Sequence, residues 1–347
     1  GSFIEYIERR VRATKLKAVI FSAIFVLLVE NSVPFILGQT AMSNAYVKSS
    51  EYSTLDNFLF NQPGFYRHLW LPRGSKWSTG NYDKPGYSAD ILMSGLWLKY
   101  ISLNTDYDAK KIPGLIVSSF NKPYSKNLLS SFSFKYIIVP FQDKTNDADF
   151  FSVYGTSQKY FIDSLDKISY LKKIDIRAKN ITVYENLSYK PHIYLTSQKE
   201  TIYSDLPYKK IDFSFINPTK YIVNLYHVSM PIYLNFSDSF NPNWELRLGT
   251  FNWLEALYKK KYFLTVNHFA NDAGLNSFYI NPTSICSGSF SCTRNSDGSY
   301  DMHLTLYFQP QSYLYAGLIV SGITFFIILV ILGYFGIKEI KSYGRKH

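Results

Sequence analysis

The stretch LYAGLIVSGITFFIILVILGYFGI, residues 314–337, decides the architecture of this chain of 347 residues. It holds 24 residues without a charge, whereas a helix needs about 20 apolar residues to cross the hydrocarbon core of a bilayer. Tyr313, Tyr315 and Tyr334 lie near its ends, and aromatic side chains are enriched at membrane–water interfaces. We therefore predict a transmembrane helix over residues 313–337.

A second, weaker apolar segment lies near the start of the chain. Residues 18–29 are apolar, but Glu30 and Asn31 interrupt the run before residues 33–37. A charge at the centre of a membrane helix costs about 3 kcal/mol, and less near the bilayer boundary. We predict a transmembrane helix over residues 18–38, with Glu30 as an intramembrane acid or as a boundary residue satisfied by water. A signal peptide is the competing interpretation.

The basic residues indicate the topology of the chain. Of the 37 basic residues, nine lie at the two ends of the chain, before the first apolar segment or after the last. The middle of the chain keeps 28 basic and 22 acidic residues, and this small excess argues against nucleic-acid binding. Positively charged flanks stay in the cytoplasm. Residues 1–17 and 338–347 are therefore predicted to be cytoplasmic, and residues 39–312 extracytoplasmic, in a multi-pass protein of the cell membrane. The nine residues are Arg9, Arg10, Arg12, Lys15, Lys17, Lys338, Lys341, Arg345 and Lys346.

The middle of the chain divides near residue 210. In residues 39–209, apolar strands alternate with helices, which is typical of α/β structure. In residues 210–312, several short strands follow one another at about 8–12-residue spacing, as in a β-sandwich. The predicted fold is thus an α+β membrane protein with an α/β region and a β-sandwich between two transmembrane helices. The expected strands are 65–71, 136–140, 181–185, 213–216, 221–228, 232–236, 244–248, 262–267, 278–280 and 303–308, and the expected helices are 88–101 and 161–171.

Cys286 and Cys292 are separated by five residues in a Ser/Gly-rich loop. With no His beside them they make a poor metal site, which needs about four ligands. We predict a disulfide if the region faces an oxidising compartment, and two free thiols otherwise.

Common catalytic motifs are missing from the sequence. It contains no G-x-S-x-G, H-E-x-x-H or C-x-x-C pattern, and its six His residues form no pair at i, i+4. This pattern weighs against a standard metal or nucleophile enzyme, and we predict no metal site and no cofactor in this chain.

Aromatic residues beside charged ones suggest sugar binding, because flat rings pack on the apolar face of a sugar and charged groups hold its hydroxyls. One such group begins in the strand 65–71 and another precedes the strand 244–248. The ordinary alternatives are a strand with one solvated face and a Trp that closes the sandwich core. The glycan-binding candidates are Tyr66, Arg67, His68, Trp70, Trp77, Asp83 and Trp244.

Four stretches in order resemble the C-terminal half of YfhO-like bacterial membrane proteins, which belong to the GT-C-like glycosyltransferases. Asn243 and His192 stand where the family usually has Gly and Arg. The stretches are residues 128–139 (LLSSFSFKYIIV), 183–187 (VYENL) with 191–195 (PHIYL), 240–244 (FNPNW), and 304–312 (LTLYFQPQS) directly before the last helix.

This resemblance implies a bundle of about a dozen membrane helices upstream and the transfer of a sugar from a polyprenyl-phosphate-linked donor. The catalytic acid of such enzymes would lie in that upstream part, and the complete enzyme could use a divalent metal. We expect this chain to support acceptor or glycan binding in the cell envelope without being catalytic by itself. The alternative is a non-catalytic surface protein, anchored in membrane lipid, that binds a glycan or another protein.

Overall fold

The computed structural model describes residues 21–30, 49–75, 77, 80–89, 112–141, 151, 156–250, 252–258, 267–287 and 291–344. The chain divides into two units. One consists of residues 1–47 with 316–347, and the other, here called the central unit, of residues 48–315.

The first part of the central unit is a mixed five-stranded sheet with the order β2-β1-β3-β5-β4. Strand β1 pairs in parallel with β2 and β3, whereas β5 is antiparallel to β3 and β4. The sequence of β3, FKYIIV, is almost continuously apolar, as expected for a strand that is covered on both faces. The strands are β1 (Arg67–Trp70), β2 (Gly86–Ser88), β3 (Phe134–Val139), β4 (Leu171–Ile174) and β5 (Thr182–Asn186).

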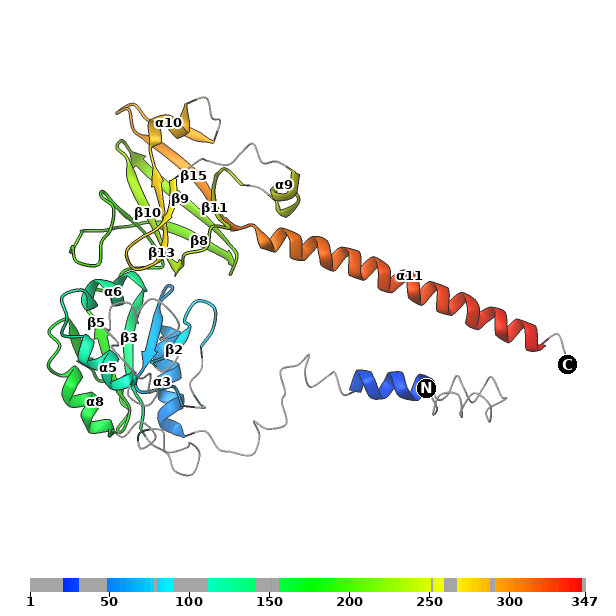
Figure 1. Ribbon diagram of the computed structural model, residues 1–347, viewed down its shortest axis with the longest axis horizontal. Helices are drawn as coiled ribbons and strands as arrows, with labels where there is room; N and C mark the ends of the chain where they lie inside the picture. The colour runs from blue at the N-terminus through cyan, green and yellow to red at the C-terminus, as the bar shows by residue number, and fades with distance from the viewer. Residues whose placement is uncertain are drawn as a thin grey trace, which may run out of the picture. The chain divides into compact units, whose positions relative to one another are not determined.

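Helices cover both faces of this sheet (Figure 1). Helices α5 (Ile112–Ser119), α6 (Ser125–Ser131) and α8 (Gln158–Leu165) pack on the face that carries Ile137. Helix α3 (Ser50–Asn61) packs on the opposite face. The result is a three-layer α/β/α arrangement.

The second part is a β-sandwich. One sheet has the order β12-β13-β10-β6-β7, and the other has the order β11-β15-β9-β8 with β14 paired to β15. Their inner faces form one apolar core. The strands are β6 (Ile193–Thr196), β7 (Lys209–Lys210), β8 (Asp212–Asn217), β9 (Lys220–Val228), β10 (Ile232–Ser239), β11 (Trp244–Leu248), β12 (Asn267–Ala270), β13 (Leu275–Ile280), β14 (Cys292–Arg294) and β15 (Tyr300–Phe308), with the short helices α9 (Trp253–Tyr258) and α10 (Pro282–Cys286).

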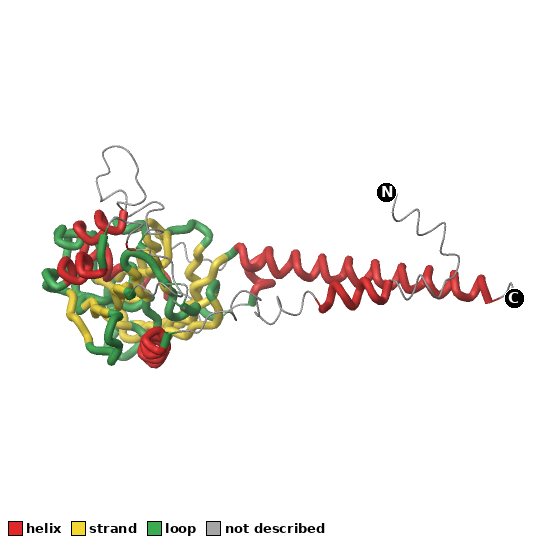
Figure 2. Tube along the Cα trace, turned by 90° about the horizontal axis from the view of Figure 1, so that it is seen from below, coloured by secondary structure: helices red, strands yellow, loops and turns green. Residues whose placement is uncertain are grey.

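The last helix, α11 (Pro310–Gly344), follows β15 with only Gln309 between them (Figures 1 and 2). Its part Pro310–Gly336 is long and apolar enough to cross a membrane. Near the other end, the described part of the predicted span 18–38 is the apolar helix Phe21–Glu30, and the rest of that span lies outside the described residues. Length and composition thus support one membrane-spanning helix among the described residues.

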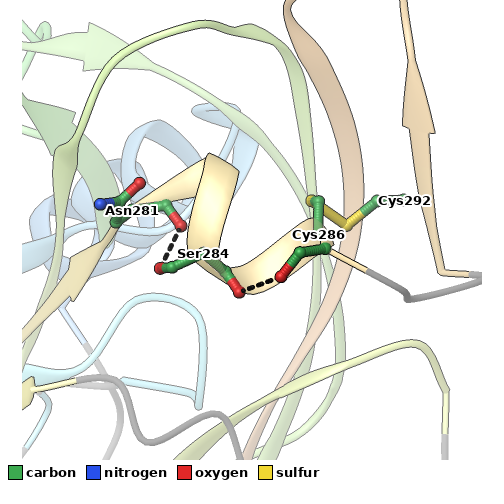
Figure 3. Close-up of a disulfide and its surroundings, with 5 residues drawn as sticks. Asn281, Ser284, Cys286 and Cys292 are labelled. Atoms are coloured by element: carbon green, nitrogen blue, oxygen red, sulfur yellow. Dashed lines mark hydrogen bonds between the residues drawn. A yellow bond between two sulfur atoms is a disulfide. The ribbon is translucent and has the colours of Figure 1, made fainter.

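The structure pairs Cys286 with Cys292 in a disulfide (Figure 3). The two Cα atoms are 5.5 Å apart. Cys286 ends helix α10, where Ser284 Oγ donates a hydrogen bond to the carbonyl of Asn281, and Cys292 begins β14. The bridge therefore ties the α10 turn to the edge of the sandwich.

Most predicted strands are present, but the bounds of two predicted helices and of one predicted region differ from the structure. Ser88 ends strand β2 and does not start a helix, and residues 90–101 lie outside the described residues. The predicted helix 161–171 is present in part, because α8 covers its first five residues and ends at Leu165, and β4 begins at Leu171. Phe161, Leu165 and Ile168 are buried at helical spacing, but the chain turns after Leu165.

The third difference concerns the boundary at residue 210. Strand β6 belongs to the sandwich because it pairs with β10, so the sandwich begins near residue 193. Pairing between strands about 40 residues apart leaves no local signal in the sequence. The predicted strand 262–267 lies outside the described residues except for Asn267, which begins β12.

Candidate functional site

The structure brings Tyr66, Trp70 and Trp77 together in one buried core under helix α3, where they pack against other side chains of the protein. Successive side chains of a strand point to opposite faces. Tyr66 and Trp70 accordingly lie in the core under α3, whereas Leu69 lies in the core under α5, α6 and α8. Arg67 and His68 are also buried, with 6% and 1% of their surface exposed. The prediction that this strand has one solvated face is therefore wrong.

The structure also accounts for the other predicted residues. Trp244 is 7% exposed and packs edge-on against Phe236, with ring centres 4.7 Å apart, so the alternative of a Trp that closes the sandwich core is confirmed. Asp83 forms an ion pair with Lys84. Trp77 packs against the core under α3. Glu30 is exposed at the end of the described N-terminal helix, in the other unit.

One predicted residue, Trp70, does line a cavity. The cavity has a volume of about 650 Å³ and lies beside β2, the edge strand of the α/β sheet. Trp70 and Ser88 are the last residues of the parallel strands β1 and β2. Ligands of α/β sheets bind outside the carboxyl ends of such strands, and drug-sized ligands occupy pockets of roughly 300–1,000 Å³. The lining residues are Trp70, Gly80, Asn81, Tyr82, Pro85, Gly86 and Ser88.

The cavity wall combines aromatic and polar groups. Tyr82 is 74% exposed, so its ring and hydroxyl are open to solvent. Asn81 Oδ1 accepts a hydrogen bond from Lys84 N at 2.8 Å, which leaves the amide Nδ2 as a donor for another partner. Ser88 Oγ accepts from Gly74 N at 2.7 Å, and its own hydroxyl hydrogen remains to be donated. An open ring beside short polar side chains is the arrangement that suits a sugar.

Gly86 is part of the cavity wall, and there is no room for a side chain at this position. A Cβ atom at this position would lie 2.5 Å from His68 Nε2 and 3.1 Å from Trp70 Nε1. Trp70 Nε1 is itself buried, with no acceptor among the described residues. The indole N–H is thus shielded from solvent, and a ligand would meet the polar groups of Asn81, Tyr82 and Ser88.

We expect Gly86→Ala to destabilise the central unit by about 1–3 kcal/mol, because the new methyl group forces the buried imidazole of His68 to move. The matched control is Gly114→Ala in helix α5, where the nearest atom, Tyr160 Oη, is at an ordinary 3.7 Å. Alanine should stabilise that helix by about 0.5–1 kcal/mol. Thermal unfolding in detergent measures both changes, and equal midpoints for the two variants would contradict the prediction.

Arg67 instead organises a polar cluster between the sheet of the α/β part and the sandwich. Its Nη1 donates hydrogen bonds of 2.8 Å to the carbonyls of Phe132 and Ser237 and to Ser237 Oγ. Its Nη2 donates to Asp238 Oδ1 at 2.6 Å. Strand β1 is thereby joined to strand β10. These hydrogen bonds occupy the guanidinium in structural contacts, so it is a poor candidate for binding a ligand.

His192 completes this cluster. Its Nδ1 lies 2.6 Å from Ser237 Oγ, and its Nε2 lies 3.1 Å from Tyr221 Oη. Burial, and then the charge of Arg67, lower the pKa of His192 well below its usual range. Burial raises the pKa of Asp238, and Arg67 offsets part of that rise. A serine and a histidine in contact could form a nucleophile, but Ser237 is 1% exposed and no substrate can reach it.

Two acids near the start of the central unit belong to the fold. Glu51 and Asp56 lie in helix α3. Glu51 accepts hydrogen bonds from Asn180 N at 2.9 Å and from Asn180 Nδ2 at 3.0 Å. Within the residues that the structure describes, no group of three or more His, Cys, Asp or Glu side chains could hold a metal ion.

Sequence reasoning missed Asn81, Tyr82 and Ser88 as site residues. A weak signal was available, because Gly80, Pro85 and Gly86 bracket Asn81 and Tyr82 in a typical turn composition. Comparisons with protein-family models, with curated proteins and with solved structures found no match.

Proposed function

We propose that this chain is the membrane-anchored, extracytoplasmic region of a GT-C-like glycosyltransferase, and that the cavity beside β2 binds a saccharide of the donor or acceptor. The observation that carries the proposal is the cavity beside β2, which reaches the last residues of β1 and β2, with the open ring of Tyr82 beside Asn81 and Ser88. A sugar needs a flat apolar surface for its C–H face and short polar groups for its hydroxyls.

The family part of the proposal rests on the order of four sequence stretches. They include the buried strand β3, strand β5, the turn before Trp244, and the passage from β15 into α11. The membrane part rests on the apolar helix α11 and on the basic residues that flank the two apolar segments. Polyprenyl-phosphate chemistry would require the upstream helices that the resemblance implies, and a non-catalytic glycan receptor would use the same cavity.

The topology can be tested with single cysteines, because Cys286 and Cys292 are paired. Tyr203→Cys, at a position 69% exposed in the central unit, should react with a membrane-impermeant thiol reagent on intact cells. Ser342→Cys should react only after permeabilisation, because positively charged flanks stay in the cytoplasm. The reverse labelling pattern would refute the proposed orientation.

Saccharide binding can be tested with the full chain in detergent. We expect a member of a panel of neutral hexose and N-acetylhexosamine oligosaccharides to bind, as measured by calorimetry. Tyr82→Ala should lose a ring–sugar contact worth about 1 kcal/mol, which is roughly fivefold in Kd. The matched control is Tyr203→Ala, since Tyr203 is similarly exposed at 69% but lies outside the cavity. No binding by any oligosaccharide, or equal affinities for both variants, would count against the proposal.

A further inference from the structure

Apolar side chains are exposed around the point where helix α11 begins. Five of them, here called the anchor-side patch, come from strand β8, helix α9 and the first turn of α11. On an ordinary soluble surface such a grouping marks an interaction site. The patch consists of Phe215, Ile216, Leu254, Tyr313 and Leu314, which are 42%, 54%, 45%, 59% and 54% exposed.

Backbone contacts bring the tip of the β8–β9 hairpin to this point. Tyr307 of β15 pairs with Lys220, and Phe308 N donates to Thr219 O at 2.9 Å. Phe215 and Ile216 precede that tip on β8, which is the edge strand of its sheet. Consecutive residues of a strand point to opposite faces, so β8 offers an apolar side chain in both directions.

Helix α9 lies beside the same junction (Figure 1). The rings of Trp253 and Tyr315 are in edge contact, with centroids 5.7 Å apart. Burial lowers the pKa of Lys220, and the nearby carboxylate of Glu255 on α9 offsets part of that effect. Asn252 Oδ1 caps the helix by accepting from Glu255 N at 3.0 Å, which fixes where the helix starts and hence where Leu254 points.

We propose that the anchor-side patch inserts into the headgroup region of the lipid bilayer that α11 enters. This inference rests on the membrane anchoring given under Proposed function. The patch is continuous along the chain with the apolar run of α11, because Tyr313 and Leu314 belong to both. Its composition, aromatic and aliphatic groups beside a Lys, is that of interfacial segments, which enter about 5–10 Å into the headgroup and acyl boundary.

Insertion of this patch would give the central unit a second attachment to the membrane, in addition to helix α11. A single helix that followed β15 without other contacts would leave the central unit free to tilt above the membrane. With the β8–β9 tip and α9 also inserted, three segments hold one end of the sandwich against the lipid. The end of β9 at Val228, where the chain turns toward Met230, is then the end remote from the membrane, because β9 begins at the tip.

The test uses the full chain in phosphatidylcholine–phosphatidylglycerol vesicles, with an environment-sensitive fluorophore on a single introduced cysteine. At Ile216→Cys we expect a blue-shifted probe that loses about half of its emission to shallow doxyl-labelled lipids. The matched control is Met230→Cys, at a position 69% exposed, where the probe should stay in water and be quenched by aqueous iodide. Adding Leu254→Asp should reduce lipid quenching at position 216, and Tyr203→Asp should not.

The possible outcomes distinguish a failure of the proposed insertion of the patch from a failure of the membrane anchoring on which it rests. A chain that does not float with the vesicles would overturn membrane anchoring itself. If the chain floats but both probes stay equally exposed to iodide, the patch does not enter the bilayer and the inference is wrong. A probe at position 216 that is shielded from iodide and also from lipid quenchers would show that protein covers the patch, which equally overturns the lipid assignment.

Discussion

Replacing Arg67 by Met is expected to lower the free energy of unfolding of the central unit by about 3–5 kcal/mol. The guanidinium is 6% exposed and donates four hydrogen bonds of 2.6–2.8 Å to Phe132, Ser237 and Asp238. Methionine fills similar space but leaves two carbonyls and a carboxylate without this donor. The partly buried Asp238 carboxylate would also lose its positive counter-charge.

Two comparisons separate this effect from the loss of any ion pair. Lys126→Met removes a partner of the exposed Asp205, and a surface pair of this kind contributes less than about 1 kcal/mol. In the double variant Arg67→Met with Asp238→Asn the buried charge is gone, so the cost should be clearly less than the sum of the two single costs. Additive costs, or equal loss in Arg67→Met and Lys126→Met, would contradict our account. Thermal and denaturant unfolding in detergent give the values.

Glu200→Gln is expected to cost about 3–5 kcal/mol in the same measurement. Glu200 is 3% exposed, and its carboxylate accepts a hydrogen bond from Lys190 Nζ and another, of 2.5 Å, from Tyr194 Oη. Lys190 is also 3% exposed. With a neutral amide in place of the carboxylate, the ammonium group stays in the interior without its counter-charge. Burial, and then the charge of Glu200, hold the pKa of Tyr194 well above its usual range, so the phenol remains a neutral donor.

The double variant Lys190→Met with Glu200→Gln provides the control for this pair. It removes both charges and should recover a large part of the loss, because a buried pair offsets its own desolvation only while both partners are present. Asp163→Asn is the matched surface change: it breaks the i, i+4 pair with Lys159, which is worth about 0.3–0.5 kcal/mol. A double variant no more stable than Glu200→Gln would show that the residues contribute independently.

The contacts of Arg67, with a hydrogen bond from helix α6, explain why the α/β part and the sandwich form one unit. Arg67 joins strand β1 to β10. Asn127 Nδ2 of helix α6 donates a hydrogen bond of 3.1 Å to the carbonyl of Ile202, which lies on the loop that follows β6. Polar groups buried at such a junction are expensive to separate, since each must regain its partners from water. The α/β part and the sandwich therefore meet in a packed interface.

Much of the fold could be predicted from local patterns. Apolar runs bounded by turn residues predicted β3, β5 and most strands of the sandwich, because burial on both faces or on alternate faces leaves a direct trace in the sequence. The alternation in Tyr66 to Trp70 was also a correct sign of a strand. It gave no information on what covers each face, and so the buried Arg67 was mistaken for a ligand-binding residue.

The candidate site was predicted only in part. Trp70 was among the predicted residues, but Asn81, Tyr82 and Ser88 were not, since they lie 11 to 18 positions further along and meet Trp70 only when β2 pairs with β1. Short polar and aromatic residues in a turn are common. Only their convergence on one cavity distinguishes them.

The sequence by itself determined the long apolar helix at the C-terminus, the strand-rich region before it and the position of most strands, because hydrophobicity and its period are local properties. The tertiary structure alone decided that β6 joins the sandwich, that Arg67 and Glu200 lie in buried networks, and that the cavity forms beside β2. Each of these depends on contacts between segments far apart along the chain, and the free energy of such contacts is set by what surrounds both partners.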